Sequence, residues 1–153
     1  MNSLLTIPWR MPTGNDLATT VSAYRKLGWD TFPDEHGSIM AGVGERFDVA
    51  TFPDALAPAF LSELPDAPVF VDARIHRCTV LTSVACDQVR DVAPDLAEAR
   101  VRALPRRTPV MLPVLMEDDW DGHRRWLVAP DAAVLPGWDE TIAAIGRAIE
   151  VAR

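Results

Sequence analysis

Apolar residues recur at helical spacing in three stretches of the chain. The first follows a capping residue, Asn15 or Asp16, and ends at Gly28, the second opens at Pro53, and the third covers 138–153. Side chains three or four positions apart share one face of a helix, so each stretch predicts a helix with one buried face. The apolar positions on these faces are Leu17, Val21, Tyr24 and Leu27, then Leu56, Phe60, Leu61 and Leu64, then Ile142, Ile145, Ile149 and Ala152.

Runs of apolar and β-branched residues between these helices predict strands. The expected strands are 29–33, 46–52, 69–72, 78–83, 109–115 and 125–129. The polar link 73–77 predicts one hairpin and the acidic tip Glu117–Asp121 a second, while 94–103 could form a short helix. Alternation along the strands predicts buried side chains at Val69, Val71, Val80, Trp126 and Val128. Because the strands cluster between the helices, the predicted class is α+β with a mixed or antiparallel sheet.

Length and composition favour one folded domain. The chain has 153 residues, of which 48% are hydrophobic and 24% charged, so we expect an irregular segment over 1–14 and one domain over 15–153. No apolar run approaches the about 20 residues of a membrane-spanning helix, and residues 1–10 lack a signal-peptide pattern. Two cysteines, Cys78 and Cys86, are too few for a disulfide scaffold. These features predict a cytoplasmic protein that makes no contact with membranes.

The charge balance opposes indiscriminate binding to nucleic acid. The formal net charge is −7, and nonspecific affinity for phosphate backbones comes from clustered Lys and Arg. Lys26 is the only lysine among 15 basic residues. With so many arginines in the composition, a single Arg is weak support for a phosphate site.

Patterns for metal binding and nucleophilic catalysis are weak. His36, His76 and His123 lie far apart in the sequence and form no zinc-binding motif. His76 and Cys78 could share one face of a strand, but no catalytic signature surrounds them. The G-x-G pattern at 42–44 is more often a tight turn than a phosphate loop. No metal or other cofactor is therefore expected.

Two groups of basic residues could contact phosphate. Arg74, His76 and Arg77 form the first group, and the second contains Arg100, Arg102, Arg106 and Arg107. The second group reads more simply as a solvated face. Trp120, within the acidic tip, is the best candidate for an exposed residue that contacts a protein partner.

A series of short motifs then resembles a known family, the bifunctional primase–polymerase (Prim-Pol) domains of the archaeo-eukaryotic primase superfamily. The similarity covers roughly residues 17–150 and is greatest to short, divergent members. In chain order it rests on Ala23-Tyr24-Arg25-Lys26-Leu27-Gly28-Trp29-Asp30-Thr31-Phe32-Pro33, Gly42-Val43-Gly44, the helix Pro53–Leu64, Pro68-Val69-Phe70-Val71-Asp72, Cys78-Thr79-Val80-Leu81, Val110-Met111-Leu112-Pro113 and Trp126-Leu127-Val128-Ala129-Pro130. The resemblance implies the family's α+β sheet with packed helices.

The resemblance also exposes a departure from the family's catalytic pattern. Active members carry a strand of the form h-h-h-D-h-D, in which two carboxylates hold divalent metal for nucleotidyl transfer. In the matching register, Thr51 and Pro53 occupy the two acidic positions. Asp48 and Asp54 flank the strand but lack the i, i+2 spacing that places two carboxylates on one face. A magnesium or manganese site would therefore exist only if the domain were active by another arrangement.

The other two family motifs are no more complete. The histidine motif survives as Arg74-Ile75-His76, which makes His76, with Arg74 and Arg77, the expected remnant of a nucleotide site. The third motif's aspartate has no clear counterpart near 107–110. The resemblance therefore implies a degenerate, non-catalytic member.

Three functions are compatible with this sequence. The leading hypothesis is a degenerate Prim-Pol-like domain that binds nucleic acid, a nucleotide or a replication-related partner, with low affinity for the nucleic acid or nucleotide. The second is an acidic protein–protein interaction module of unrelated fold, with Trp120 as the contact residue. The third is an active metal-dependent nucleotidyl transferase that uses Asp48, Asp54 and His76. A structure separates these hypotheses by showing whether the three candidate catalytic side chains converge.

Overall fold

The computed structural model describes residues 13–85, 91–115, 123–130 and 134–153 and shows an α+β fold. Within these residues four helices accompany two sheets. The helices are α1 (Gly14–Lys26), α2 (Ala57–Glu63), α3 (Pro94–Glu98) and α4 (Trp138–Ala152), with a 3₁₀ turn at Asp54–Leu56. The strands are β1 (Thr31–Pro33), β2 (Ile39–Gly42), β3 (Asp48–Pro53), β4 (Val69–Asp72), β5 (Arg77–Thr82), β6 (Arg102–Ala103), β7 (Pro109–Leu112) and β8 (Arg124–Val128).

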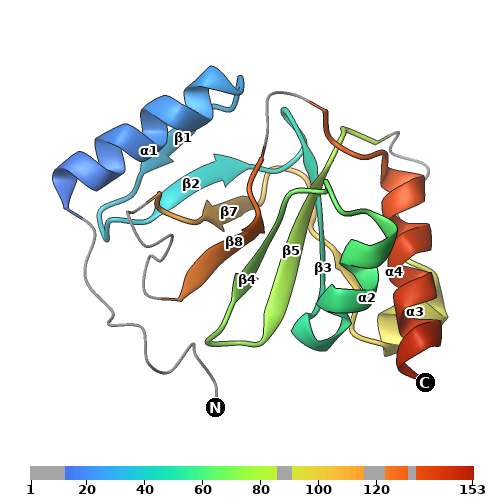
Figure 1. Ribbon diagram of the computed structural model, residues 1–153. Helices are drawn as coiled ribbons and strands as arrows, with labels where there is room; N and C mark the ends of the chain where they lie inside the picture. The colour runs from blue at the N-terminus through green and yellow to red at the C-terminus, as the bar shows by residue number, and fades with distance from the viewer. Residues whose placement is uncertain (1–12, 86–90, 116–122, 131–133) are drawn as a thin grey trace, which may run out of the picture.

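Both sheets are antiparallel (Figure 1). The larger has the strand order β6-β3-β5-β4-β8, and the smaller has the order β1-β2-β7. The α+β class with an antiparallel sheet is thus confirmed, and so is the hairpin of β4 and β5. The predicted hairpin of the last two strands is wrong, because β7 pairs with β2 in the small sheet whereas β8 pairs with β4 in the large one. The acidic tip Glu117–Asp121, with Trp120, lies outside the described residues.

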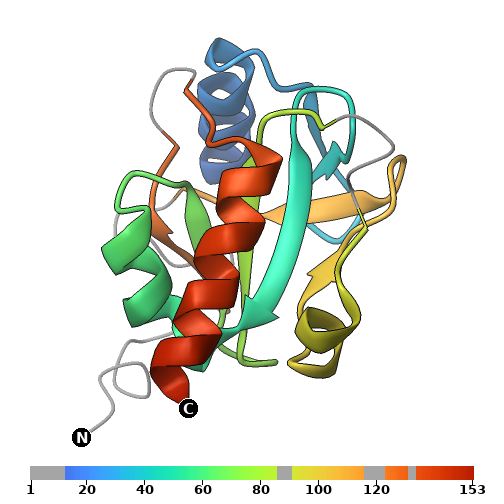
Figure 2. The ribbon, with the colours of Figure 1, turned by 90° about the vertical axis from the view of Figure 1, so that its right-hand side faces the viewer.

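Helices α2 and α4 cover one face of the large sheet, and α4 runs along this face in front of β3 (Figure 2). The core here joins Phe60 of α2 and Ile145 of α4 to alternate strand residues such as Phe52 and Val80, all fully buried. Burial of such side chains contributes about 1.5–3 kcal/mol each. Most of the predicted core is confirmed, while Leu64, Ile142 and Val128 are half-buried.

The small sheet and α1 enclose a second core against the other face of the large sheet. Tyr24 of α1 lies at its centre, where its hydroxyl donates to the Pro113 carbonyl and accepts from Trp126 Nε1 at 2.9 Å. The Tyr24 ring also stacks on Trp29 with a centroid separation of 5.8 Å. The cap of α1 differs from the prediction, since Thr13 rather than Asn15 or Asp16 caps the helix through a reciprocal bond with Asp16. No helix in the described ranges is long and apolar enough to cross a membrane.

Candidate phosphate-binding site

Strand β3 has two different faces, and the candidate site lies on the one turned away from α2 and α4. Ala50 and Phe52 point into the core beneath the helices. Successive strand residues point to opposite faces, so Thr51 lies on the other side of the sheet. Thr51 is paired directly with Thr79 of β5 and with Arg102 of β6. These pairings bring side chains from three strands together on one face.

Arg77 joins this group from the first position of β5. Its Nη2 donates to Thr51 Oγ1 at 2.5 Å. The sequence prediction placed Arg77 in the exposed link before the strand. Its position is instead half-buried, because its side chain lies along the sheet beside Thr51.

Two further guanidinium groups lie close enough to act on Arg77. Burial, followed by the positive charges of Arg102 and Arg100, lowers the pKa of Arg77 below its usual value. A guanidinium remains charged at neutral pH even after such a shift. The three residues Arg77, Arg100 and Arg102, here called the arginine cluster, therefore concentrate positive charge on one region of an acidic protein.

The main chain fixes both arginines that follow α3. Arg100 has φ of 68°, a left-handed conformation directly after the helix, and its N–H donates to the Ala97 carbonyl. The next residue, Val101, is 1% exposed and anchors the turn in the core. Arg102 is then held in register opposite Thr51. The backbone positions of these two arginines are thus set by the turn and by strand pairing, and both side chains are exposed.

The arginine cluster has no carboxylate partner within ion-pair distance among the described residues. Arg74 differs, because its Nη2 lies 3.5 Å from Asp72 Oδ2, and Arg124 Nε lies 3.7 Å from the same oxygen. Asp72 is almost fully buried, and its single negative charge is shared by these two cations. The structure therefore divides the predicted group Arg74–Arg77 into one arginine that is ion-paired, Arg74, and one that has no carboxylate partner among the described residues, Arg77.

His76 and Asp54 meet at the rim of the sheet. His76 Nδ1 lies 3.3 Å from Asp54 Oδ2, and the Asp54 N–H donates to the His76 carbonyl at 3.0 Å. His76 lies in the turn before β5 with φ of 55°, and its side chain is 79% exposed. This turn conformation removes the strand geometry by which His76 and Cys78 could share a face. Cys78 points instead into the helix-covered core, where burial raises the pKa of its thiol to about 12.

Asp48 lies at the other end of β3, about 17 Å of strand away from the Asp54 end. Its side chain is fully buried and accepts a hydrogen bond from the Ala85 N–H at 2.7 Å. The Arg106 guanidinium lies 3.2 Å from its Oδ2. Two catalytic metals must lie about 4 Å apart among convergent carboxylates, so Asp48 and Asp54 cannot share a metal site. Their separation leaves Asp48 with a structural role.

The G-x-G pattern forms the turn between β2 and β3. Gly44 has φ of 95°, and its N–H donates to the Phe47 carbonyl at 2.7 Å. A Cβ at Gly44 would lie 2.5 Å from Cγ of Arg106. The glycine therefore lets the Arg106 side chain pass close to the turn on its way to Asp48, in agreement with the prediction of a tight turn.

The remaining candidates do not join the cluster. Among the described residues no three His, Cys, Asp or Glu side chains form a group that could hold a metal ion. Arg106 is committed to Asp48. His36 lies beside Glu35 on the surface, and Trp120 and Cys86 are outside the described residues. Comparison of the chain with known protein families, curated proteins and solved structures finds no match in any of the three.

Sequence reasoning missed the combination of Arg77 with Arg100 and Arg102. The sequence shows both groups of basic residues, but its pattern over 94–103 is compatible with a short helix and does not indicate a strand there. The structure ends α3 at Glu98 and begins β6 at Arg102. The available signal was the β-branched Val101 between two arginines, which suits a short strand with its polar side chains outward.

Proposed function

We propose that this chain is a non-catalytic binding domain whose arginine cluster holds the polyphosphate group of a nucleotide. The observation that carries the proposal is the convergence of three guanidinium groups that have no carboxylate partner in the described part of the chain. Guanidinium groups bind phosphate oxygens through paired, charge-assisted hydrogen bonds. The Thr51 hydroxyl adds a neutral group at the same place.

The arrangement of the cations favours a polyphosphate over an internal phosphodiester. A single-stranded nucleic acid presents one charge per phosphate along a line, and its binding surfaces combine a basic groove with aromatic side chains that stack on bases. Here three positive charges gather in one region, close enough for Arg100 and Arg102 to act on Arg77. The phosphate groups of a nucleotide polyphosphate carry several negative charges close together, and these would relieve the repulsion between the arginines.

The proposal shares Arg77 with the nucleotide-site remnant that the Prim-Pol resemblance implies, while Arg100 and Arg102 take the place of Arg74 and His76. Thr51 stands at a position where active members carry a carboxylate, and it lies next to Arg77. A hydroxyl and a guanidinium can hold a phosphate but cannot replace two metal-binding carboxylates. The proposed domain therefore binds without transferring a nucleotidyl group.

Calorimetric titration with ATP at low salt, without divalent metal, tests the binding. Arg77→Gln and Arg102→Gln should each weaken the affinity about tenfold or more, because hydrogen bonds to charged groups contribute about 1.5–3 kcal/mol. Arg74→Gln is the matched control and should change affinity less than twofold, since Arg74 is paired with Asp72 and is not among the charges that act on Arg77. Binding should also weaken as salt rises, because the net charge of −7 leaves only local attraction.

Two outcomes would contradict the proposal. One is the absence of ATP binding at low salt, or binding that survives the double variant Arg77→Gln, Arg102→Gln. The other is tighter binding of an oligothymidine that has no terminal phosphate, which would indicate a strand-binding surface instead.

A primer-extension assay tests the absence of catalysis. With magnesium or manganese, the wild-type protein should extend no primer, because Thr51 and Pro53 occupy the metal-binding positions of the resembled family. Extension activity that disappears in Asp54→Asn would restore the enzymatic alternative.

A further inference from the structure

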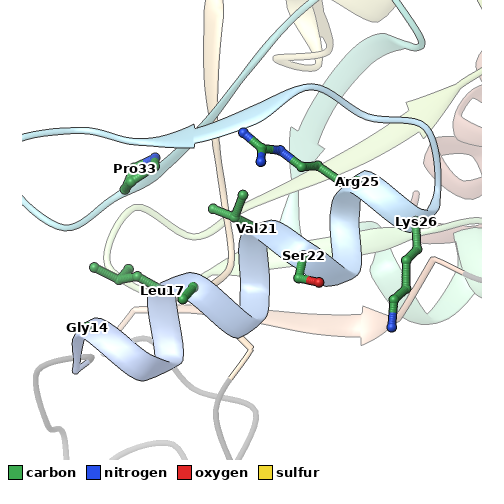
Figure 3. A pocket seen from close by; sticks show the side chains of 8 residues that line it. Gly14, Leu17, Val21, Ser22, Arg25, Lys26 and Pro33 are labelled. Atoms are coloured by element: carbon green, nitrogen blue, oxygen red, sulfur yellow. The ribbon is translucent and has the colours of Figure 1, made fainter.

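A groove runs along the outer side of α1, away from the arginine cluster. It has a volume of about 680 Å³, and most of its lining comes from α1, with Pro33 of β1 as the opposite wall. Figure 3 shows Leu17, Val21 and Arg25 turned toward β1, with Ser22 and Lys26 on the other side of the helix. The floor of the groove is therefore apolar, with Leu17 half-buried and Val21 9% exposed, and Arg25 and Lys26 flank its C-terminal end from the two sides of the helix.

The surface of α1 beside this floor carries small side chains. Gly14, Ala18 and Ser22 follow one another at intervals of four residues and line the groove in one row. A second, shallower hollow of about 450 Å³ adjoins this row on the neighbouring side of α1. Residues four apart lie one above the other on a helix, so the row offers a strip of small side chains that another backbone can approach closely.

The two cations at the end of the groove are not compensated. Neither Arg25 nor Lys26 has a carboxylate within ion-pair distance among the described residues, and both side chains are exposed. The C-terminus of α1 favours cations, but its dipole corresponds to only about half a negative charge. A net positive charge therefore remains here, on a protein whose overall charge is −7.

We propose that this groove is a docking site for an acidic amphipathic helix of a partner protein. The apolar face of such a helix would cover the half-buried Leu17 and the exposed Ala18, above the largely buried Val21, and its carboxylates would meet Arg25 and Lys26. Helix-in-groove recognition of this kind relies on apolar anchors spaced three or four residues apart. The groove follows α1 for about 18 Å, which matches a partner helix of about three turns.

The test uses a synthetic amphipathic peptide of about 15 residues, with Leu on one face and Glu on the other. Titrated into the ¹⁵N-labelled full-length protein, it should shift the amide signals of Leu17–Lys26 selectively. The double variant Arg25→Glu, Lys26→Glu should weaken binding about fivefold, as expected for two exposed ion pairs. Arg46→Glu is the matched control, because Arg46 is exposed and lies outside the groove. Ala18→Trp should fill the groove and reduce the affinity further.

Other results would overturn the proposal. Equal binding of a peptide with Lys in place of Glu would show that charge plays no part. Chemical-shift changes at residues outside α1, with none in α1, would place the contact elsewhere. A concentration-dependent dimer that Ala18→Trp abolishes would assign the groove to a second copy of the chain. Binding to anionic lipid vesicles, lost in the Arg25→Glu, Lys26→Glu variant, would assign it to a membrane surface.

Discussion

Arg106 and Arg77 come from the two basic groups of the sequence, yet they serve opposite purposes. Arg106 reaches a fully buried carboxylate, that of Asp48, at 3.2 Å, and its own side chain is 27% exposed. Arg77 donates to the Thr51 hydroxyl, has no carboxylate partner in the described part of the chain, and has like charges around it. The first arginine neutralises a charge that the fold has buried. The second concentrates a charge that the fold leaves uncompensated.

The difference lies in what each arrangement requires of a ligand. A buried ion pair is complete in itself, and a ligand near Arg106 would have to compete with Asp48. An uncompensated group of cations carries repulsion that an anion can relieve, so its free energy is lower when a ligand is bound. Residue type and exposure alone do not show which of the two arginines could bind an anion. The positions of nearby acidic side chains show it.

The largest expected effect comes from removing the paired arginine. Arg106→Ala leaves the Asp48 carboxylate buried without its guanidinium and should lower the free energy of unfolding by about 3 kcal/mol. Arg77→Ala removes a like-charge repulsion and should change it by less than about 0.5 kcal/mol. Urea denaturation of both variants measures the difference. Similar losses in the free energy of unfolding for the two variants would contradict the difference in role between Arg106 and Arg77.

A double variant sharpens this result. Asp48→Asn together with Arg106→Ala removes both charges, and the amide oxygen can still accept from the Ala85 N–H. It should be more stable than Arg106→Ala alone, because the main cost of the single variant is an uncompensated buried charge.

Much of the fold can be predicted from the sequence, because the spacing of apolar residues indicates which side chains are buried. The helix over 138–153 and the hairpin of β4 and β5 are both present as predicted. The spacing of apolar residues cannot show that β7 and β8 belong to different sheets, since both strands have the same alternation. Pairing across long stretches of chain depends on which surfaces meet in three dimensions.

The candidate site was predictable only in part, for the same reason. The sequence places Arg77 and Arg102 in two separate groups of basic residues. Their proximity in the fold depends on the pairing of β6 with β3 and of β3 with β5. The ion pair between Asp48 and Arg106 joins positions 58 residues apart and has no local signal.

A change at Gly44 tests the path by which Arg106 reaches its partner. Gly44→Ala adds a Cβ at 2.5 Å from Cγ of Arg106 and also places alanine at φ of 95°. We expect a loss of about 2 kcal/mol, which combines backbone strain with displacement of the Arg106 side chain. Gly28→Ala is the control, since Gly28 has φ of 86° but nothing within 4 Å of the added atom. It should cost about 1 kcal/mol, and equal losses would show that Arg106 is not displaced.

The smallest effect concerns Arg100, where the fold accepts strain in order to present a cation. Its φ of 68° is a conformation that glycine adopts readily and other residues do not. Relief of the left-handed strain, about 1–2 kcal/mol, exceeds the cost of the freedom that glycine adds to the unfolded chain, about 0.4–1 kcal/mol. Arg100→Gly should therefore raise the free energy of unfolding by about 0.5–1 kcal/mol and at the same time weaken ATP binding. Arg107→Gly is the matched control, because Arg107 has φ of 70° and is not among the charges that act on Arg77. It should stabilise the protein equally and leave ATP binding unchanged. If both variants bind ATP as the wild type does, Arg100 belongs with the solvated surface, and the cluster reduces to Arg77 and Arg102.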